Sequence, residues 1–142
     1  MKHVAVVLVS LLAVDMDKEA AEAALHSLVR PDPSFQVTGV ALFDGQRILA
    51  YWEGLEAEVD EAVARTTAHP AFDEHVFLAR GRIGQRRYRD WLLPLKTVGG
   101  ADLSRVIHAD WRTFSQRMRG ADAPVTGMEH LAALMLHPPA MP

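Results

Sequence analysis

Cysteine is absent from the 142 residues, which excludes a disulfide framework and any site built on a thiolate. Basic charge is scarce as well: 15 Lys and Arg face 18 Asp and Glu, and the net charge of −3 argues against a general nucleic-acid binder. No apolar run is long enough to predict a membrane span. The apolar start, Val4 to Leu12, lacks a small-residue cleavage site, which favours a buried first strand over a signal peptide. These absences predict a cytoplasmic protein.

What is present is the composition of a globular protein, 49% apolar and 23% charged, at a length typical of one domain. The run from Val4 to Val9 is continuously apolar, as in a strand buried on both faces of its sheet. Two further apolar runs flank Asp44-Gly45, a pair suited to a hairpin turn. Helices are predicted from the N-cap Asp17 to about Arg30 and from Leu55 to Ala68, and two more strands at 75–83 and 91–98. The order βαββαββ predicts an α+β fold, a ferredoxin-like sandwich with both helices on one face of the sheet.

The segment after Gly99-Gly100 predicts two more helices. A helical stripe of apolar residues comprises Leu103, Val106, Ile107, Trp111, Phe114 and Met118, and a second group comprises Leu131, Leu134 and Met135. Thr126 to Glu129 has the spacing of a capping box. We expect residues 1–98 to form the domain and residues 99–142 to be a helical extension that covers the open face of its sheet, in a single structural unit.

The hairpin carries a recognisable pattern: Thr38-Gly39, an apolar strand, the turn Asp44-Gly45, a second strand and Glu53-Gly54. It resembles the signature of the BLUF family, blue-light sensors that use FAD. Leu8-Val9-Ser10 stands where that family has Tyr-x-Ser, and the segment 86–93 is similar to its R-x-F-x-x-W-x-M motif. His69-Pro70-Ala71-Phe72 corresponds to its D-x-R-H. The resemblance runs without gaps from about Val4 to about Leu95.

The resemblance implies an FAD site at positions that are mostly substituted here. They are Leu8, Asp32, Ala50, Trp52, His69 and Phe72. Leu8 replaces the family's tyrosine, Ala50 its glutamine and Asp32 its asparagine, so the electron donor and two partners of the flavin ring are missing. Trp52 stands where the family has Leu or Ile, and its volume predicts a narrowed pocket. We therefore expect a degenerate sensory domain with weak or absent FAD binding and no photocycle, with no enzymatic activity.

Other functions remain open. The family resemblance also allows a functional FAD-binding photoreceptor. A small ferredoxin-like enzyme of the acylphosphatase kind would need an asparagine, and the chain has none. A metal site is not indicated, because His130 and His137 lack further ligands at suitable spacing.

The expected partners are proteins. Short BLUF proteins commonly oligomerise, and the apolar C-terminal helices predict self-association, at least to a dimer, or contact with a protein partner. The arginines between 80 and 89 are predicted to lie in a solvated loop or to form part of a partner surface. We expect no binding to nucleic acid or membrane.

Overall fold

The computed structural model describes residues 2–28, 36–89, 91–111 and 126–136. Within these ranges nine elements follow one another: β1 (His3–Leu12), α1 (Lys18–Leu28), β2 (Thr38–Phe43), β3 (Arg47–Leu55), α2 (Glu56–Ala68), β4 (Phe72–Arg82), β5 (Leu92–Thr97), α3 (Gly100–Ile107) and α4 (Gly127–Leu136). The strands form one sheet in the order β4-β1-β3-β2-β5. β5 runs parallel to β2, and the other neighbouring pairs are antiparallel. The expected α+β fold is confirmed.

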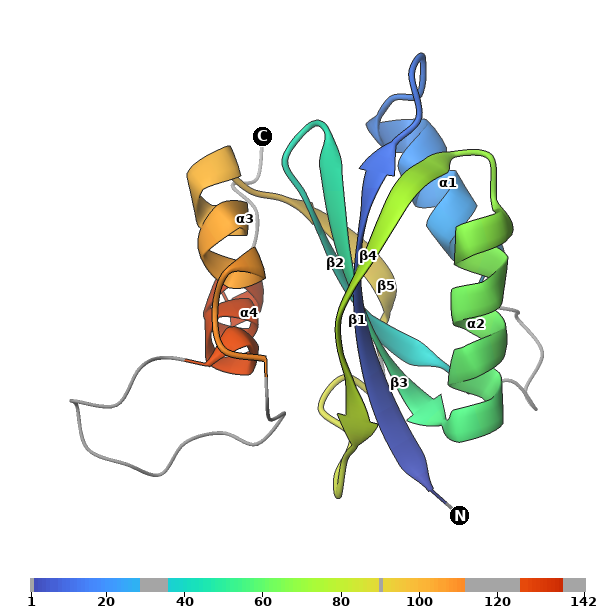
Figure 1. Ribbon diagram of the computed structural model, residues 1–142, viewed down its shortest axis with the longest axis vertical. Coiled ribbons are helices and arrows are strands. Elements are labelled where there is room, and N and C mark those ends of the chain that lie inside the picture. The colour runs from blue at the N-terminus through green and yellow to red at the C-terminus, as the bar shows by residue number, and fades with distance from the viewer. Residues whose placement is uncertain (1, 29–35, 90, 112–125, 137–142) are drawn as a thin grey trace.

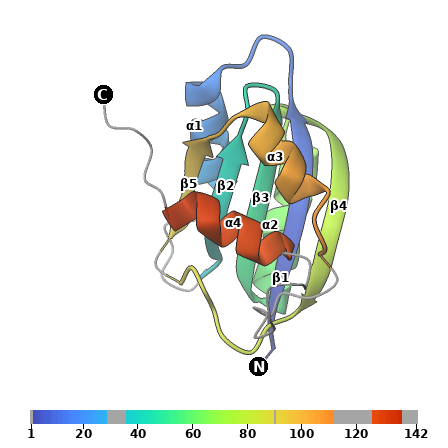
Figure 2. The ribbon, with the colours of Figure 1, turned by 90° about the vertical axis from the view of Figure 1, so that its left-hand side faces the viewer.

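The sheet separates two layers of helices, with α1 and α2 on one face and α3 and α4 on the other (Figure 1, Figure 2). Val4 and Val6 belong to the cluster under α1 and α2, which we call the first core. Ala5, Val7 and Val9 belong to the cluster under α3 and α4, the second core. Successive side chains of a strand point to opposite faces, so a strand covered on both sides must be apolar throughout. β1 meets that requirement.

The C-terminal helices supply the second core with Leu103, Val106, Met128 and Leu131, all fully buried. One expectation was wrong: Trp111 does not extend the helical stripe, because α3 ends at Ile107. The chain turns there and Asp110 forms an isolated bridge with Thr126, which still brings the indole of Trp111 into the second core. The predicted stripe residues Phe114 and Met118 lie outside the described residues.

The bounds of two strands also differ from the sequence prediction. β4 begins at Phe72 rather than at residue 75, because Phe72 and Asp73 pair with the last residues of β1 despite the polar sequence. β5 spans a shorter range than 91–98. The predicted N-cap of the first helix is confirmed, since the Asp17 carboxylate accepts a 2.9 Å hydrogen bond from the Ala20 N–H. None of the helices in the described ranges has the length and hydrophobicity needed to cross a bilayer.

Candidate functional site

Three of the sequence-predicted positions meet on the face of the sheet under α1 and α2. Leu8 of β1 and Ala50 of β3 are directly paired across the two strands, and Trp52 follows two residues further along β3. Ala50 and Trp52 both belong to the first core, and Leu8 shares their face because paired residues of a sheet point the same way. The sheet register therefore assembles one group from residues more than forty positions apart.

This group is closely packed. Leu8 is 2% exposed, Ala50 3% and Trp52 1%. The residues of α1 and α2 that face them in the first core are equally buried, including Leu25, Val59 and Ala62. An open slot wide enough for water would leave accessible surface on these side chains, so in the described part of the structure no such slot borders Leu8, Ala50 or Trp52.

Trp52 is the largest side chain in this packing and carries an unusual polar atom. Its indole N–H is buried and has no hydrogen-bond partner among the described residues. A buried donor left unpaired costs about 1–3 kcal/mol, so most such atoms in proteins are paired. Trp52 thus fills space at an energetic cost, and its N–H is the one polar group that this trio of side chains presents.

Gly39 of the T-G pair allows the close approach of β2 and β3 beside Trp52. The two residues are paired across the strands. A Cβ at Gly39 would lie 1.8 Å from the carbonyl oxygen of Tyr51, which no side chain can tolerate. This glycine is therefore required by backbone packing.

The remaining predicted positions are separated from this trio. Phe72 pairs with Leu12, four residues along β1 from Leu8, or roughly 13 Å at ~3.3 Å per residue. His69 caps the end of α2, its Nδ1 accepts a 3.0 Å hydrogen bond from the Ala71 N–H, and its ring lies 5.7 Å from that of Phe72. The two aromatic rings shape the turn into β4. Asp32 lies outside the described residues.

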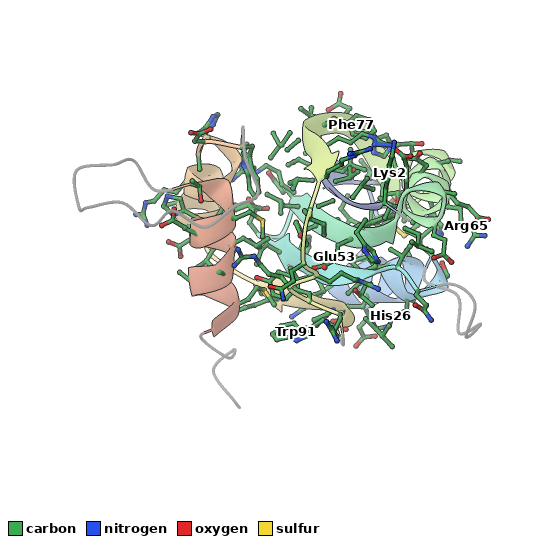
Figure 3. All side chains as sticks on the ribbon, turned by 90° about the horizontal axis from the view of Figure 1, so that it is seen from below. Lys2, His26, Glu53, Arg65, Phe77 and Trp91 are labelled. Carbon is green, nitrogen blue, oxygen red and sulfur yellow. The ribbon has the colours of Figure 1, made fainter. Side chains whose placement is uncertain are left out.

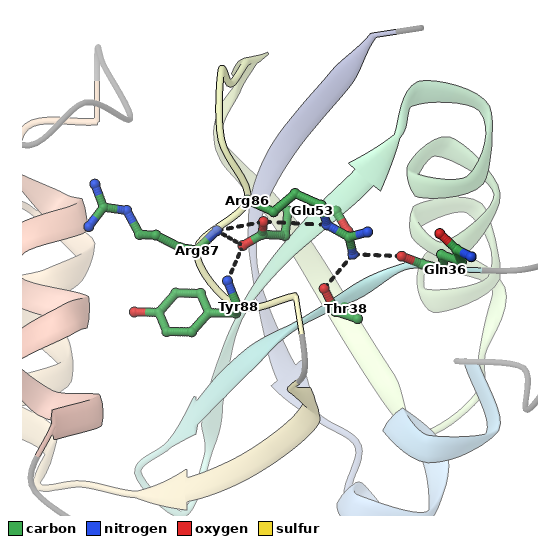
Figure 4. A network of polar contacts seen from close by, with 6 residues as sticks. All are labelled: Gln36, Thr38, Glu53, Arg86, Arg87 and Tyr88. Carbon is green, nitrogen blue, oxygen red and sulfur yellow. Dashed lines mark hydrogen bonds and ion pairs between the residues drawn. The ribbon is translucent and has the colours of Figure 1, made fainter.

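Sequence reasoning missed a buried charged cluster around Glu53, which lies near the centre of the molecule (Figure 3). The Glu53 side chain is fully buried and its carboxylate accepts hydrogen bonds from the N–H groups of Arg87 and Tyr88 at 2.7–2.9 Å. Arg86 lies 3.7 Å away as its ionic partner. The same guanidinium donates to Thr38 Oγ1 at 2.5 Å and to the Gln36 carbonyl at 2.6 Å (Figure 4).

Burial dominates the electrostatics of this cluster. It raises the pKa of Glu53 above the ordinary value of 4.5, although the N–H groups of Tyr88 and Arg87 and the charge of Arg86 act in the opposite direction. Burial also raises the pKa values of Tyr51 and Tyr88. The rings of these tyrosines meet edge to face with centroids 5.6 Å apart, on the second-core side of the sheet. Glu53 is the glutamate of the E-G pair, so its motif was visible in the sequence but its partners were not.

A surface hollow lies apart from the trio, between α1 and β5. Its volume is about 520 Å³ and its lining consists of Glu22, His26, Trp91, Leu92, Pro94 and Leu95. The described residues contain no group of three or more potential metal ligands.

Comparison with known proteins places this geometry in context. The family model of sensors of blue-light using FAD, abbreviated BLUF, matches residues 4–93. No curated protein matches the chain in sequence. Among solved structures, the dark state of the BLUF protein BlrB has 22% identity over 68% of this chain and 73% of its own, with a TM-score of 0.60.

Two further structures are similar over more of the chain. A calcium and cyclic-diGMP complex of BlrP1 from Klebsiella pneumoniae has 16% identity over 94% of this chain, with a TM-score of 0.62, but only 34% of its own chain is covered. The photo-activated state of BlsA has 12% identity over 99% of both chains, with a TM-score of 0.64. At these identities the structural likeness establishes the fold alone.

Proposed function

Because this chain belongs to the BLUF family of blue-light sensors, we propose that it is a BLUF-type signalling domain that has kept the scaffold while binding FAD weakly or not at all. It would have no photocycle, no enzymatic activity of its own, and an output that passes through protein contacts. Its place in the cell would be the cytoplasm.

The observation that carries this proposal is the packing of Leu8, Ala50 and Trp52. In the family's pattern these positions face the flavin, and here protein atoms alone leave them 1–3% exposed. A planar ring system could enter only if Trp52 and the adjacent helices moved. That movement would cost part of the first core, which lowers any affinity for the ring.

The chemistry of the side chains supports the same conclusion. Leucine and alanine have no hydrogen-bonding groups, so a flavin ring beside Leu8 and Ala50 would leave polar atoms unpaired. Each such buried atom costs about 1–3 kcal/mol. Two of them would weaken binding by roughly two orders of magnitude, at ~1.4 kcal/mol per tenfold change. The Ser10 hydroxyl, two residues along β1 from Leu8, is already engaged, at 2.7 Å from His75 Nδ1.

The residues present therefore do not fit the cofactor that the family implies. Leu8 cannot act as an electron donor and Ala50 has no amide to rearrange. The competing candidate is a working FAD-binding photoreceptor. Family membership favours it, and so does the unpartnered N–H of Trp52, which offers one hydrogen-bond donor at the site.

Absorption spectroscopy decides between the two candidates. The purified protein is mixed with excess FAD, freed of unbound flavin, and scanned before and after blue light. We expect no bound yellow chromophore and no spectral change. A bound flavin whose absorption band shifts to the red in light and recovers in the dark would contradict the proposal.

Repair variants serve as the matched control. Leu8→Tyr with Ala50→Gln restores two contacts but leaves Trp52 in place, so this double variant should still fail to retain flavin. Adding Trp52→Leu, which opens space, and Asp32→Asn should increase retention. Flavin uptake by the double variant alone would show that the slot was open, and that Trp52 does not block it.

A further inference from the structure

β4 forms one edge of the sheet and exposes an apolar centre. In the described strand order it has β1 on one side only. Val76 and Phe77 are 55% and 56% exposed, although large apolar side chains are usually covered. They pair with Val9 and Leu8, adjacent residues of β1, so they lie on opposite faces of the sheet edge. Phe77 lies at the side of the molecule away from Trp91, which precedes the other edge strand (Figure 3).

The two ends of β4 carry opposite charges. Asp73 and Glu74 near its start and Arg80 and Arg82 at its end are all exposed. Arg80 donates to Asp60 and Glu56 of α2, at 2.7 and 3.4 Å. The side chains of Arg82, Asp73 and Glu74 have no hydrogen-bond or ionic partner within the described part of the chain. The strand is thus acidic, apolar and basic in turn.

This order is self-complementary. Asp73 and Glu74 precede Phe77 by four and three residues, and Arg82 follows it by five. Arg82 is the basic residue available to a second copy, because Arg80 is already paired with α2. A two-fold axis near Phe77 would place the acidic end of one β4 beside the basic end of another. It would also bring the two Phe77 side chains together at the centre, because a two-fold contact joins the same patch from both copies.

The edge is not built to extend the sheet by backbone hydrogen bonds. Its register with β1 shifts twice, between Val7 and Leu8 and between Val9 and Leu11. Glu74 has a positive φ of 47°. Such bulges interrupt the regular row of N–H and C=O groups that an added strand needs. A partner on this edge would be held by side chains.

We propose that the β4 edge is a self-association surface, which joins two copies of this chain in antiparallel orientation around Phe77. Charge complementarity favours a second copy as the partner. When two copies of β4 lie antiparallel, the acidic end of each faces the basic end of the other, as a two-fold contact between identical chains requires. The proposal is independent of flavin binding, and it assigns the contact to β4 rather than to the C-terminal helices.

The first test is the mass of the intact chain by sedimentation velocity over a range of concentrations. The wild type should associate beyond the 15.7 kDa monomer, and added salt should weaken the association. Phe77→Ser should raise the dissociation constant roughly tenfold or more, as expected for the centre of an interface. Leu92→Ser is the matched control, because Leu92 is 63% exposed on the opposite edge strand. It should leave the association unchanged.

A charge exchange provides the second test. Arg82→Glu makes the exposed charge of β4 mostly acidic, and Asp73→Lys with Glu74→Lys makes it basic, so each variant alone should remain monomeric. An equimolar mixture should form a heterodimer, because each altered edge then meets its complement. A monomeric wild type at all concentrations, association that survives Phe77→Ser, or a mixture that stays monomeric would each overturn the proposal. A wild type that stays monomeric but binds a different protein on this edge would overturn it too.

Discussion

Two adjacent residues of β3 show how much a single position can decide. Trp52 points into the first core, while Glu53 points to the other side and holds the segment 86–88. Both side chains are fully buried, yet one leaves its polar atom unpaired and the other is bonded to three neighbours. A buried polar group stabilises a fold only when its partners are in place.

Replacing Glu53 with glutamine should destabilise the protein by about 1–3 kcal/mol, the range for a buried hydrogen-bonding group left unpaired. The amide nitrogen of glutamine cannot accept a hydrogen bond, so at least one of the N–H groups of Arg87 and Tyr88 loses an acceptor. Arg86 keeps its bonds to Thr38 and Gln36, which moderates the loss. Urea unfolding at neutral pH measures the effect.

The same pair of proteins should differ in pH dependence. Because burial raises the pKa of Glu53 in the folded state above 4.5, the folded protein holds this proton more tightly than the unfolded chain. Its contribution to stability is therefore complete below pH 4.5 and declines as pH rises through the raised pKa. The stability difference between wild type and Glu53→Gln should shrink over that interval, whereas Glu19→Gln on the exposed first turn of α1 should show no such trend. A difference that grows with pH would contradict the assigned direction.

At the scale of elements, α3 and α4 are attached to the sheet by specific contacts as well as by burial. Arg47 at the start of β3 donates to the Gly100 carbonyl and to Ser104 Oγ of α3 at 2.9–3.0 Å. Lys96 of β5 donates to the Leu134 carbonyl in the last turn of α4. The predicted capping box of α4 is confirmed, since Glu129 N–H donates to Thr126 Oγ1 at 3.1 Å and Thr126 N–H to the Glu129 carboxylate at 3.3 Å.

The first residues of the two helices provide a matched pair of substitutions. A Cβ at Gly127 would lie 2.2–2.6 Å from the Trp111 indole, whereas at Gly100 the nearest atom would be 3.8 Å away. Gly127→Ala should therefore force α4 away from Trp111 and cost about 1–3 kcal/mol. Gly100→Ala should be neutral or stabilising by up to ~1 kcal/mol, because it restricts only the unfolded chain. Equal unfolding midpoints for the two variants would show that α4 does not pack against the Trp111 indole.

At the scale of the whole molecule, both cores share one sheet. β1 and β3 contribute alternate side chains to the first and second cores, so loss of either helical layer exposes the same strands. The division into residues 1–98 and an extension 99–142 stays a prediction, and so does their union in one structural unit.

We expect unfolding in urea to be a single cooperative transition for this reason. Helix content followed by circular dichroism and tryptophan fluorescence should give coincident curves, because Trp52 reports on the first core and Trp111 on the second. An early fluorescence change in wild type that disappears in Trp111→Phe would show that the C-terminal helices unfold separately.

Local sequence determined much of this protein. The continuous run of β1 required burial on both faces, Asp17 and Thr126 started helices, and the T-G, D-G and E-G pairs marked the hairpin and the family. These features depend on residues close together in the chain, whose spacing is readable without a fold. Predicted boundaries failed where contacts from elsewhere prevailed, as when pairing with β1 drew Phe72 and Asp73 into a strand.

Tertiary structure decided what these residues face. Only the register of β1 and β3 places Leu8 against Ala50, and only the packing of α1 and α2 shows that Trp52 occupies the space beside them. The partners of Glu53 lie 33 to 35 residues further along the chain, beyond any local motif. Phe77 is 56% exposed, and only the strand order places it at an edge of the sheet. The spacing of residues sets which face of its own helix or strand a side chain lies on. What that side chain packs against depends on segments distant in the sequence, which come together only in the folded protein.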